Sequence, residues 1–147
     1  RYERLPSMEA TAYPSIDGLL SQLKKSGCHV GVVTNKTQRL APQVLADTGL
    51  AQSIDVLICP EHVTHIKPDP EGIVLAMKQL GVDPARTLYV GDHKKDVDAA
   101  LAAGVTAVAV AYGFIPESDH PRLWGAHHIA ALPQDLTTLI LNLTVRE

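Results

Sequence analysis

Apolar residues recur at helical spacing in some stretches of this chain and form short β-branched runs in others, and the two kinds of stretch alternate. The first helical stretch covers about residues 15–26, because it follows a proline-serine pair, has one apolar face and stops before Gly27. The run at residues 29–34 comes next and predicts a strand. Two adjacent valines in this run indicate burial on both faces, as in a parallel sheet.

The alternation continues toward the C-terminal end. Further strands are predicted at about residues 55–59, 87–90, 106–111 and 128–130. Further helices are predicted at about residues 37–48, 69–81, 97–104 and 136–143. The stretch from Gly113 to His128 is rich in proline, glycine and histidine and is typical of a long surface loop. Strands that alternate with helices imply right-handed crossovers and therefore an α/β three-layer sandwich with a parallel sheet.

Composition limits the classes to which the chain can belong. With 147 residues, 46% of them hydrophobic, it has the size of one ordinary domain. Its net charge of −3 arises from scattered residues of both signs, so we expect no nucleic acid and no membrane surface as a partner. No stretch reaches the roughly 18 apolar residues of a membrane span. Cys28 and Cys59 are expected to be reduced thiols, which fits a cytoplasmic protein with small-molecule partners.

Polar residues follow three of the predicted strands, and ligands bind at the carboxyl ends of strands in such folds. Thr34-Asn35 follows the first strand and Lys67 lies on the loop after the second. Gly91-Asp92 follows the third, with Asp96 one helical turn further on. Each feature alone has a plain structural interpretation as a turn, a helix cap or a solvated side chain. Together, a hydroxyl, a backbone amide, an ammonium and two carboxylates can bind phosphate and Mg²⁺, as phosphoryl transfer requires.

Three short motifs carry a resemblance to a known family. The sequence has VVTNK at 32–36, KPDP at 67–70 and VGDHKKD at 90–96, and their order and spacing resemble the second, third and fourth motifs of haloacid dehalogenase-like hydrolases. The stretch with the last two motifs is especially similar to the phosphoglycolate phosphatase-like branch, and the whole resemblance covers about residues 13–143. It implies a Mg²⁺-dependent phosphatase that hydrolyses small phosphomonoesters through an aspartyl-phosphate intermediate.

The resemblance also implies a role for each matching residue. Thr34 would bind the transferring phosphoryl group together with the backbone of Asn35, and Lys67 would stabilise the nucleophile and the phosphoryl oxygens. Asp92 would ligate Mg²⁺, and Asp96 would support the metal site through water or as a partner of the ligand. The glycine before Asp92 would let the backbone approach closely.

The family's first motif, a strand followed by Asp-x-Asp-Gly, is not found in the 147 residues. In the family its first aspartate attacks phosphorus and its second is the general acid and base. The segment Ser15-Ile16-Asp17-Gly18 echoes the motif, but serine stands at the nucleophile position and the segment lies in a predicted helix. Residues 1–14 contain no apolar run that could form the strand.

We therefore expect residues 1–14 to be the exit linker of a missing cap domain. Residues 15–147 would be the C-terminal part of the core domain, with a sheet that lacks its central first strand. On this expectation the chain is truncated and nearly inactive alone. Two alternatives stay open: a non-catalytic phosphate and Mg²⁺-binding module, and an unrelated doubly wound nucleotide-binding domain, which the absence of a glycine-rich loop after the first strand disfavours. Neither the substrate nor the oligomeric state is indicated by the sequence.

Overall fold

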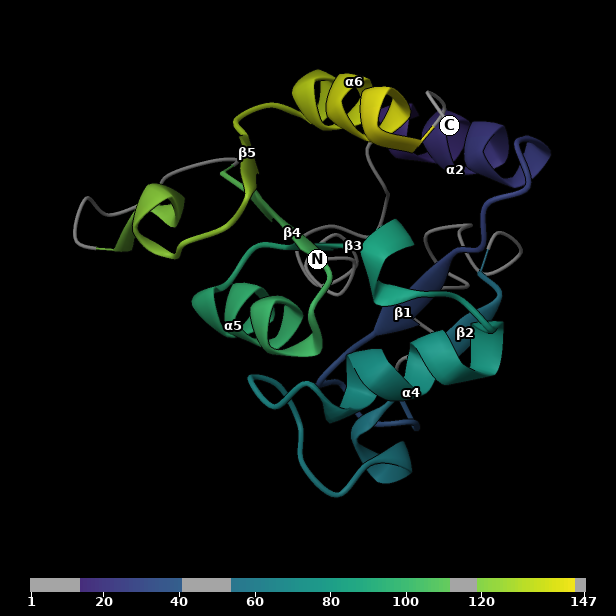
Figure 1. Cartoon of the computed structure of the whole chain (residues 1–147), viewed down its shortest axis with the longest axis vertical. Helices are drawn as coiled ribbons and strands as arrows, with labels where there is room; N and C mark the ends of the chain where they lie inside the picture. Colours follow the sequence, from purple (N-terminus) through teal and green to yellow (C-terminus); the bar gives the residue numbers. More distant parts are fainter. Residues whose placement is uncertain (1–13, 41–53, 112–118, 145–147) are drawn as a thin grey trace.

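The computed structural model describes residues 14–40, 54–111 and 119–144 of the chain (Figure 1). Its α-helices are α2 (Pro14–Lys25), α4 (Glu71–Leu80), α5 (Lys94–Ala103) and α6 (Pro133–Thr144). Its strands are β1 (Gly31–Val33), β2 (Val56–Ile58), β3 (Leu88–Gly91), β4 (Thr106–Val110) and β5 (His128–Ala130). Short 3-10 turns lie at Pro60–His62, Pro84–Arg86 and Pro121–Leu123. Strands and helices therefore alternate along the described chain, as the hydrophobic pattern predicts.

Several predictions fall partly or wholly outside the described residues. The helix expected at about 37–48 lies mostly on residues 41–53, although residues 38–40 at its start form a turn. Part of the expected surface loop lies on residues 112–118. Residues 1–13 of the expected linker are also outside the described ranges, and Pro14 is already the first residue of α2.

The described strands form two parallel sheets. In the first, β1 pairs with β2, with Val33 opposite Ile58. In the second, the order is β3-β4-β5, with Val90 opposite Val108 and Val108 opposite His128. Among the described residues no strand joins β1 to β3. This division agrees with the prediction of a parallel sheet without its central strand.

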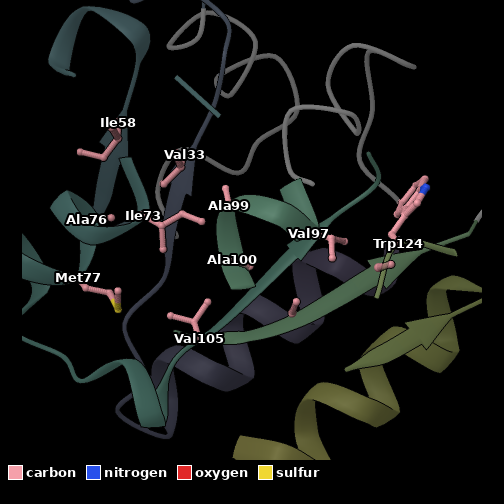
Figure 2. Packing of buried hydrophobic residues seen from close by; sticks show 12 residues of the cluster. Val33, Ile58, Ile73, Ala76, Met77, Val97, Ala99, Ala100, Val105 and Trp124 are labelled. Carbon is pink, nitrogen blue, oxygen red and sulfur yellow. The ribbon is translucent and has the colours of Figure 1, made fainter. Parts of the chain in front are cut away.

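Helices cover the strands on two sides, which gives the predicted three layers (Figure 1). Alternate residues of β4 point to opposite sides, as in any strand. Val108 and Val110 belong to the hydrophobic cluster with α2 and α6, whereas Ala107 and Ala109 belong to the cluster with α4 and α5. Figure 2 shows the second cluster, in which Ile73 of α4 lies near the strands. The α/β sandwich prediction is confirmed.

The small residues of the second cluster set how closely the layers approach. Ala99 and Ala100 of α5 and Ala107 and Ala109 of β4 are each 0% exposed. Because these side chains are short, the α5 backbone lies near the strands, and the N-terminal end of α5 lies beside the end of β3. This packing positions the polar residues that follow β3.

Every helix in the described parts of the chain is too short or too polar to span a lipid bilayer. Cys28 and Cys59 are both free cysteines, as expected for reduced thiols.

Asp55 joins the C-terminal end of α2 to the first sheet. Its carboxylate accepts hydrogen bonds from the Lys24 ammonium and, at 2.8 Å, from the Val30 backbone amide. The Lys24 hydrogen bond, followed by the one from Val30, lowers the pKa of the Asp55 carboxyl below its ordinary value. The stabilisation is therefore complete above about pH 4, the unfolded pKa of aspartate, and is lost as the pH falls through the lower pKa of the folded state.

We predict that Asp55→Asn lowers the free energy of unfolding by about 1 kcal/mol at pH 7, since a neutral amide loses the charge-assisted bonds. The loss should shrink as the pH falls from 5 toward 2, because the wild-type carboxylate also becomes neutral there. Urea unfolding of the wild type and the variant across this pH range measures the difference in the free energy of unfolding. Asp98→Asn, which removes the exposed Lys94–Asp98 pair, is the matched control and should cost less than about 0.5 kcal/mol. An Asp55→Asn loss that is equal at both pH extremes would contradict the assignment.

Candidate active site

Thr34 directly follows β1 and begins the first loop of the candidate site. Its backbone amide donates to the Ile58 carbonyl at 3.0 Å, which extends the parallel pairing by one bond. The side chain is buried, with only 4% of the residue exposed, and the Lys36 amide donates to its Oγ1 at 3.0 Å. Asn35, between these two residues, is half-buried. The strand end and the turn together fix the hydroxyl at the carboxyl edge of β1.

Lys67 comes from the loop between β2 and α4, and its ammonium is buried at the ends of three elements. Nζ donates to Asp96 Oδ1 at 2.6 Å, to the Tyr89 hydroxyl at 3.0 Å and to the Val33 carbonyl at 3.1 Å. The Lys67 side chain is only 1% exposed. A buried charge is tolerated only when it is paired and hydrogen-bonded, and these partners meet that requirement. Lys67 therefore ties β1, β3 and α5 together.

Asp96 lies in the first turn of α5 and is 0% exposed. One carboxylate oxygen accepts from Lys67, and the other accepts from the backbone amides of Asp92 at 3.1 Å and His93 at 3.2 Å. The first-turn position suits a carboxylate, because the helix N-terminus has unpaired amide groups and a partial positive charge. A single carboxylate thus holds both the ammonium and the loop that carries Asp92.

Gly91 ends β3 directly beside this carboxylate. A Cβ atom built at Gly91 would meet Asp96 Cβ at 2.2 Å and Asp96 Cγ at 2.7 Å. Atoms cannot approach that closely, and the obstacle is the branch point of a fully buried side chain. Only glycine allows Asp96 to lie under the strand end.

Asp92 and His93 form the outer part of the site. The Asp92 side chain is 4% exposed, whereas His93 is 50% exposed, and His93 Nδ1 lies 2.9 Å from Asp92 Oδ1. Ligand atoms of Asp92, His93 and Asp96 lie within 4.8 Å of one another. Carboxylate oxygens are the protein ligands that Mg²⁺ prefers, and it takes one or two of them together with water and phosphate oxygens. The donor chemistry at this edge therefore fits Mg²⁺.

A second acidic group stabilises the loop that carries Lys67. Glu71, the first residue of α4, accepts hydrogen bonds from the backbone amides of Thr64 at 2.8 Å and His65 at 2.9 Å. These bonds hold the pKa of the Glu71 carboxyl below its ordinary value. The Asp69 carboxylate accepts a hydrogen bond from the Glu71 amide at 2.9 Å. Asp69 and Glu71 together therefore hold the loop against the start of α4.

The structure brings the predicted residues to one region, but it also includes groups that the sequence did not indicate. The Tyr89 hydroxyl and the Val33 carbonyl both contact the Lys67 ammonium. The only sequence signal for Tyr89 is a side chain with a polar end in an otherwise apolar strand, two residues before Gly91. Glu71 gave a weaker signal still, because an acidic residue at the start of a helix is common for electrostatic reasons alone.

Comparison with known proteins gives a consistent result. The family haloacid dehalogenase-like hydrolase matches residues 2–110. The chain is 41% identical over 140 residues to an N-acetylmuramic acid 6-phosphate phosphatase from Pseudomonas aeruginosa, a match that covers 95% of this chain and 62% of the relative. It is 35% identical over 136 residues to a phosphoglycolate phosphatase from Xanthomonas campestris, covering 92% and 62% of the two chains.

The chain also resembles the crystal structure of a HAD family hydrolase from Deinococcus radiodurans, with a TM-score of 0.81 and 23% sequence identity. The match covers 90% of this chain and 60% of that one and shows that the two share a fold. The chain spans about 62% of the length of the two sequence relatives. Its match to the family extends over most of its residues and includes the strand ends described above. The chain therefore belongs to the haloacid dehalogenase-like hydrolases.

Proposed function

We propose that this chain supplies the phosphate-binding and metal-binding parts of a Mg²⁺-dependent phosphatase that hydrolyses small phosphomonoesters. The observation that carries the proposal is the buried Lys67 ammonium at the carboxyl edge of the sheets, 2.6 Å from Asp96. Because the same Asp96 carboxylate accepts from the amide of Asp92, the cation and the candidate metal ligand have one common support. With Mg²⁺ bound to Asp92, the ammonium and the metal would together present positive charge to a phosphate.

Each residue at this edge has a distinct task in the proposed reaction. The Thr34 hydroxyl and the Asn35 amide donate hydrogen bonds to the phosphoryl oxygens. The Lys67 ammonium neutralises charge on those oxygens, and its burial strengthens the interaction because little water competes. Asp96 positions two groups: one of its carboxylate oxygens holds the Lys67 ammonium, and the other holds the loop that carries Asp92.

Mg²⁺ is the proposed metal, and Asp92 is its proposed ligand in this chain. Both oxygens of Asp96 already accept hydrogen bonds within the chain, so we assign Asp96 a supporting role. When bound, Mg²⁺ would supply positive charge to the phosphoryl oxygens and help to orient the substrate.

The nucleophilic aspartate has to come from an Asp-x-Asp-Gly segment, which the 147 residues do not contain. We propose that turnover requires such a segment together with this chain, and that the 147 residues alone bind ligand with little or no turnover. The same absence favours the second candidate, a module that binds phosphate and Mg²⁺ without catalysis. The two candidates differ in one respect: only the phosphatase gains turnover when the segment is joined to the chain.

The names of two relatives support a proposal for the substrate class. One is named for N-acetylmuramic acid 6-phosphate and the other for phosphoglycolate, and both compounds are small phosphomonoesters. We propose a small phosphorylated metabolite of this class, and both compounds belong in the first substrate panel.

We predict that Asp92→Asn abolishes Mg²⁺-dependent turnover in a protein that joins this chain to an Asp-x-Asp-Gly segment. The expected fall in kcat is at least about 100-fold, because a neutral amide binds Mg²⁺ far less well than a carboxylate. Phosphate release from the two panel compounds, with and without Mg²⁺, measures it.

Asp98→Asn is the matched control for this variant, because Asp98 lies on α5 and pairs only with Lys94 among the described salt bridges. It should retain wild-type turnover. Unchanged turnover in Asp92→Asn would refute the metal assignment. A joined protein that binds phosphate with Mg²⁺ but releases none from any substrate would favour the binding module.

We predict that Lys67→Met lowers the free energy of unfolding of the 147-residue chain by about 3–5 kcal/mol, since it leaves the buried Asp96 carboxylate without its cation. Replacing Asp96 by asparagine in the same chain should recover part of this loss, because the uncompensated charge is gone. Urea unfolding of the two single variants and the double variant measures the coupling. Strictly additive losses would show that the ion pair contributes nothing to stability.

A further inference from the structure

We propose that Tyr89 is a positioning residue for Lys67: its hydroxyl fixes the place of the ammonium relative to the phosphate-binding edge of β1. This inference rests on the proposed function, because it assigns the task of Tyr89 within the same site. The relevant contacts are the 3.0 Å hydrogen bond from Lys67 Nζ to the Tyr89 hydroxyl and the 2.9 Å hydrogen bond from that hydroxyl to the Val33 carbonyl.

Tyr89 lies on the face of β3 that is directed toward Asp96. Side chains two residues apart in a strand point to the same side, so Tyr89 shares a side with Gly91, where a Cβ atom would run into Asp96. Tyr89 also packs against the hydrophobic cluster of α4 and α5. Its ring centroid lies 5.5 Å from Lys67 Nζ, within the range of a cation–π contact.

The ammonium donates to acceptors on three different elements. A lysine ammonium has three N–H donors, and its acceptors include Asp96 Oδ1, the Tyr89 hydroxyl and the Val33 carbonyl, each within 3.1 Å. The acceptors belong to α5, β3 and β1. Because the Tyr89 hydroxyl accepts from Lys67 and donates to Val33, its own orientation is fixed as well.

The Val33 carbonyl makes this arrangement relevant to phosphate binding. The Val30 carbonyl accepts from the Asp55 amide just before β2, and the Thr34 amide donates to Ile58 in β2, so alternation directs the carbonyl of Val33 to the opposite edge of β1. Thr34, the proposed phosphate-binding residue, follows Val33 in the chain. Tyr89 therefore links the ammonium to the strand that positions the Thr34 hydroxyl, although no backbone ladder joins β1 to β3 in the described residues.

Removing the hydroxyl would change the balance of forces on the ammonium. The charged carboxylate of Asp96 on α5 is a stronger acceptor than the neutral Tyr89 hydroxyl and the Val33 carbonyl on the strands, and these two groups oppose its pull on the ammonium. Without the Tyr89 hydroxyl, we expect the ammonium to move toward α5 and away from Thr34. Because a misplacement of about 1 Å can reduce a rate by about 100-fold, we expect the smaller displacement caused by one lost hydrogen bond to reduce it less.

The first test uses the 147-residue chain and needs no substrate. In the chain with ¹⁵N-labelled lysine, the buried Lys67 ammonium should give an NMR signal with slow hydrogen exchange, and Lys67→Arg identifies this signal by removing it. Tyr89→Phe should shift the signal and speed its exchange by about 10-fold, the effect of one lost hydrogen bond to a charged group. Thr87→Val is the matched control, because the Thr87 hydroxyl donates to the Asp83 carbonyl at 2.6 Å. An unchanged Lys67 signal in Tyr89→Phe would overturn the proposal.

Tyr89→Phe should fold, because phenylalanine keeps the partly buried ring. A second measurement, which does not need this variant, tests the proposal if Tyr89→Phe fails to fold. The chain has four tyrosines, so replacing Tyr2, Tyr13 and Tyr112 by phenylalanine leaves Tyr89 alone. With 3-fluorotyrosine at this position, the ¹⁹F signal should move when Lys67 is changed to arginine. A ¹⁹F signal that stays in place would show that the hydroxyl does not sense the ammonium.

The second test uses the joined, active phosphatase. Tyr89→Phe should lower kcat by about 10-fold and change KM by less than about twofold, because a misplaced ammonium mainly weakens transition-state stabilisation. A purely structural role would lower the melting temperature and leave kcat of the folded enzyme unchanged, which would overturn the proposal. If the wild-type joined protein has no turnover, the proposed function fails, and the NMR measurement alone decides the role of Tyr89.

Discussion

The buried ion pair between Lys67 and Asp96 is the interaction on which the rest of this edge depends. Both side chains are at most 1% exposed, so neither charge can be solvated by water. Each must therefore find its partners within the chain, and those partners determine which elements meet. The ammonium brings the ends of β1 and β3 together, and the carboxylate holds the amides of Asp92 and His93 at the start of α5.

The hydrophobic layers make this pair possible. Alanines at the contact between α5 and β4 are fully buried and let the helix lie close to the strands. Gly91 completes the approach, since no other residue leaves room for Asp96 under the end of β3. The position of the Lys67–Asp96 pair at the sheet edge thus depends on small side chains in the hydrophobic core.

Membership of the haloacid dehalogenase-like hydrolases agrees with this architecture. The two sequence relatives described above share 41% and 35% identity with the chain, and the TM-score of 0.81 shows the shared fold. The described strands divide into two sheets, β1-β2 and β3-β4-β5. In the described chain, side-chain hydrogen bonds to the Val33 carbonyl link these sheets, with Lys67 and Tyr89 as the donors.

The sequence by itself determined the alternation of strands and helices, the parallel α/β class, the family, and the short list of polar residues at strand ends. These features are local: a helical or strand period is visible within about ten residues, and a motif within fewer. Only the tertiary structure decided which partners those residues have. Asp96 and Lys67 are 29 positions apart, and Lys67 and Tyr89 are 22 apart. No periodicity connects positions so distant, because their contact depends on how the layers pack and on which buried charge has to be neutralised.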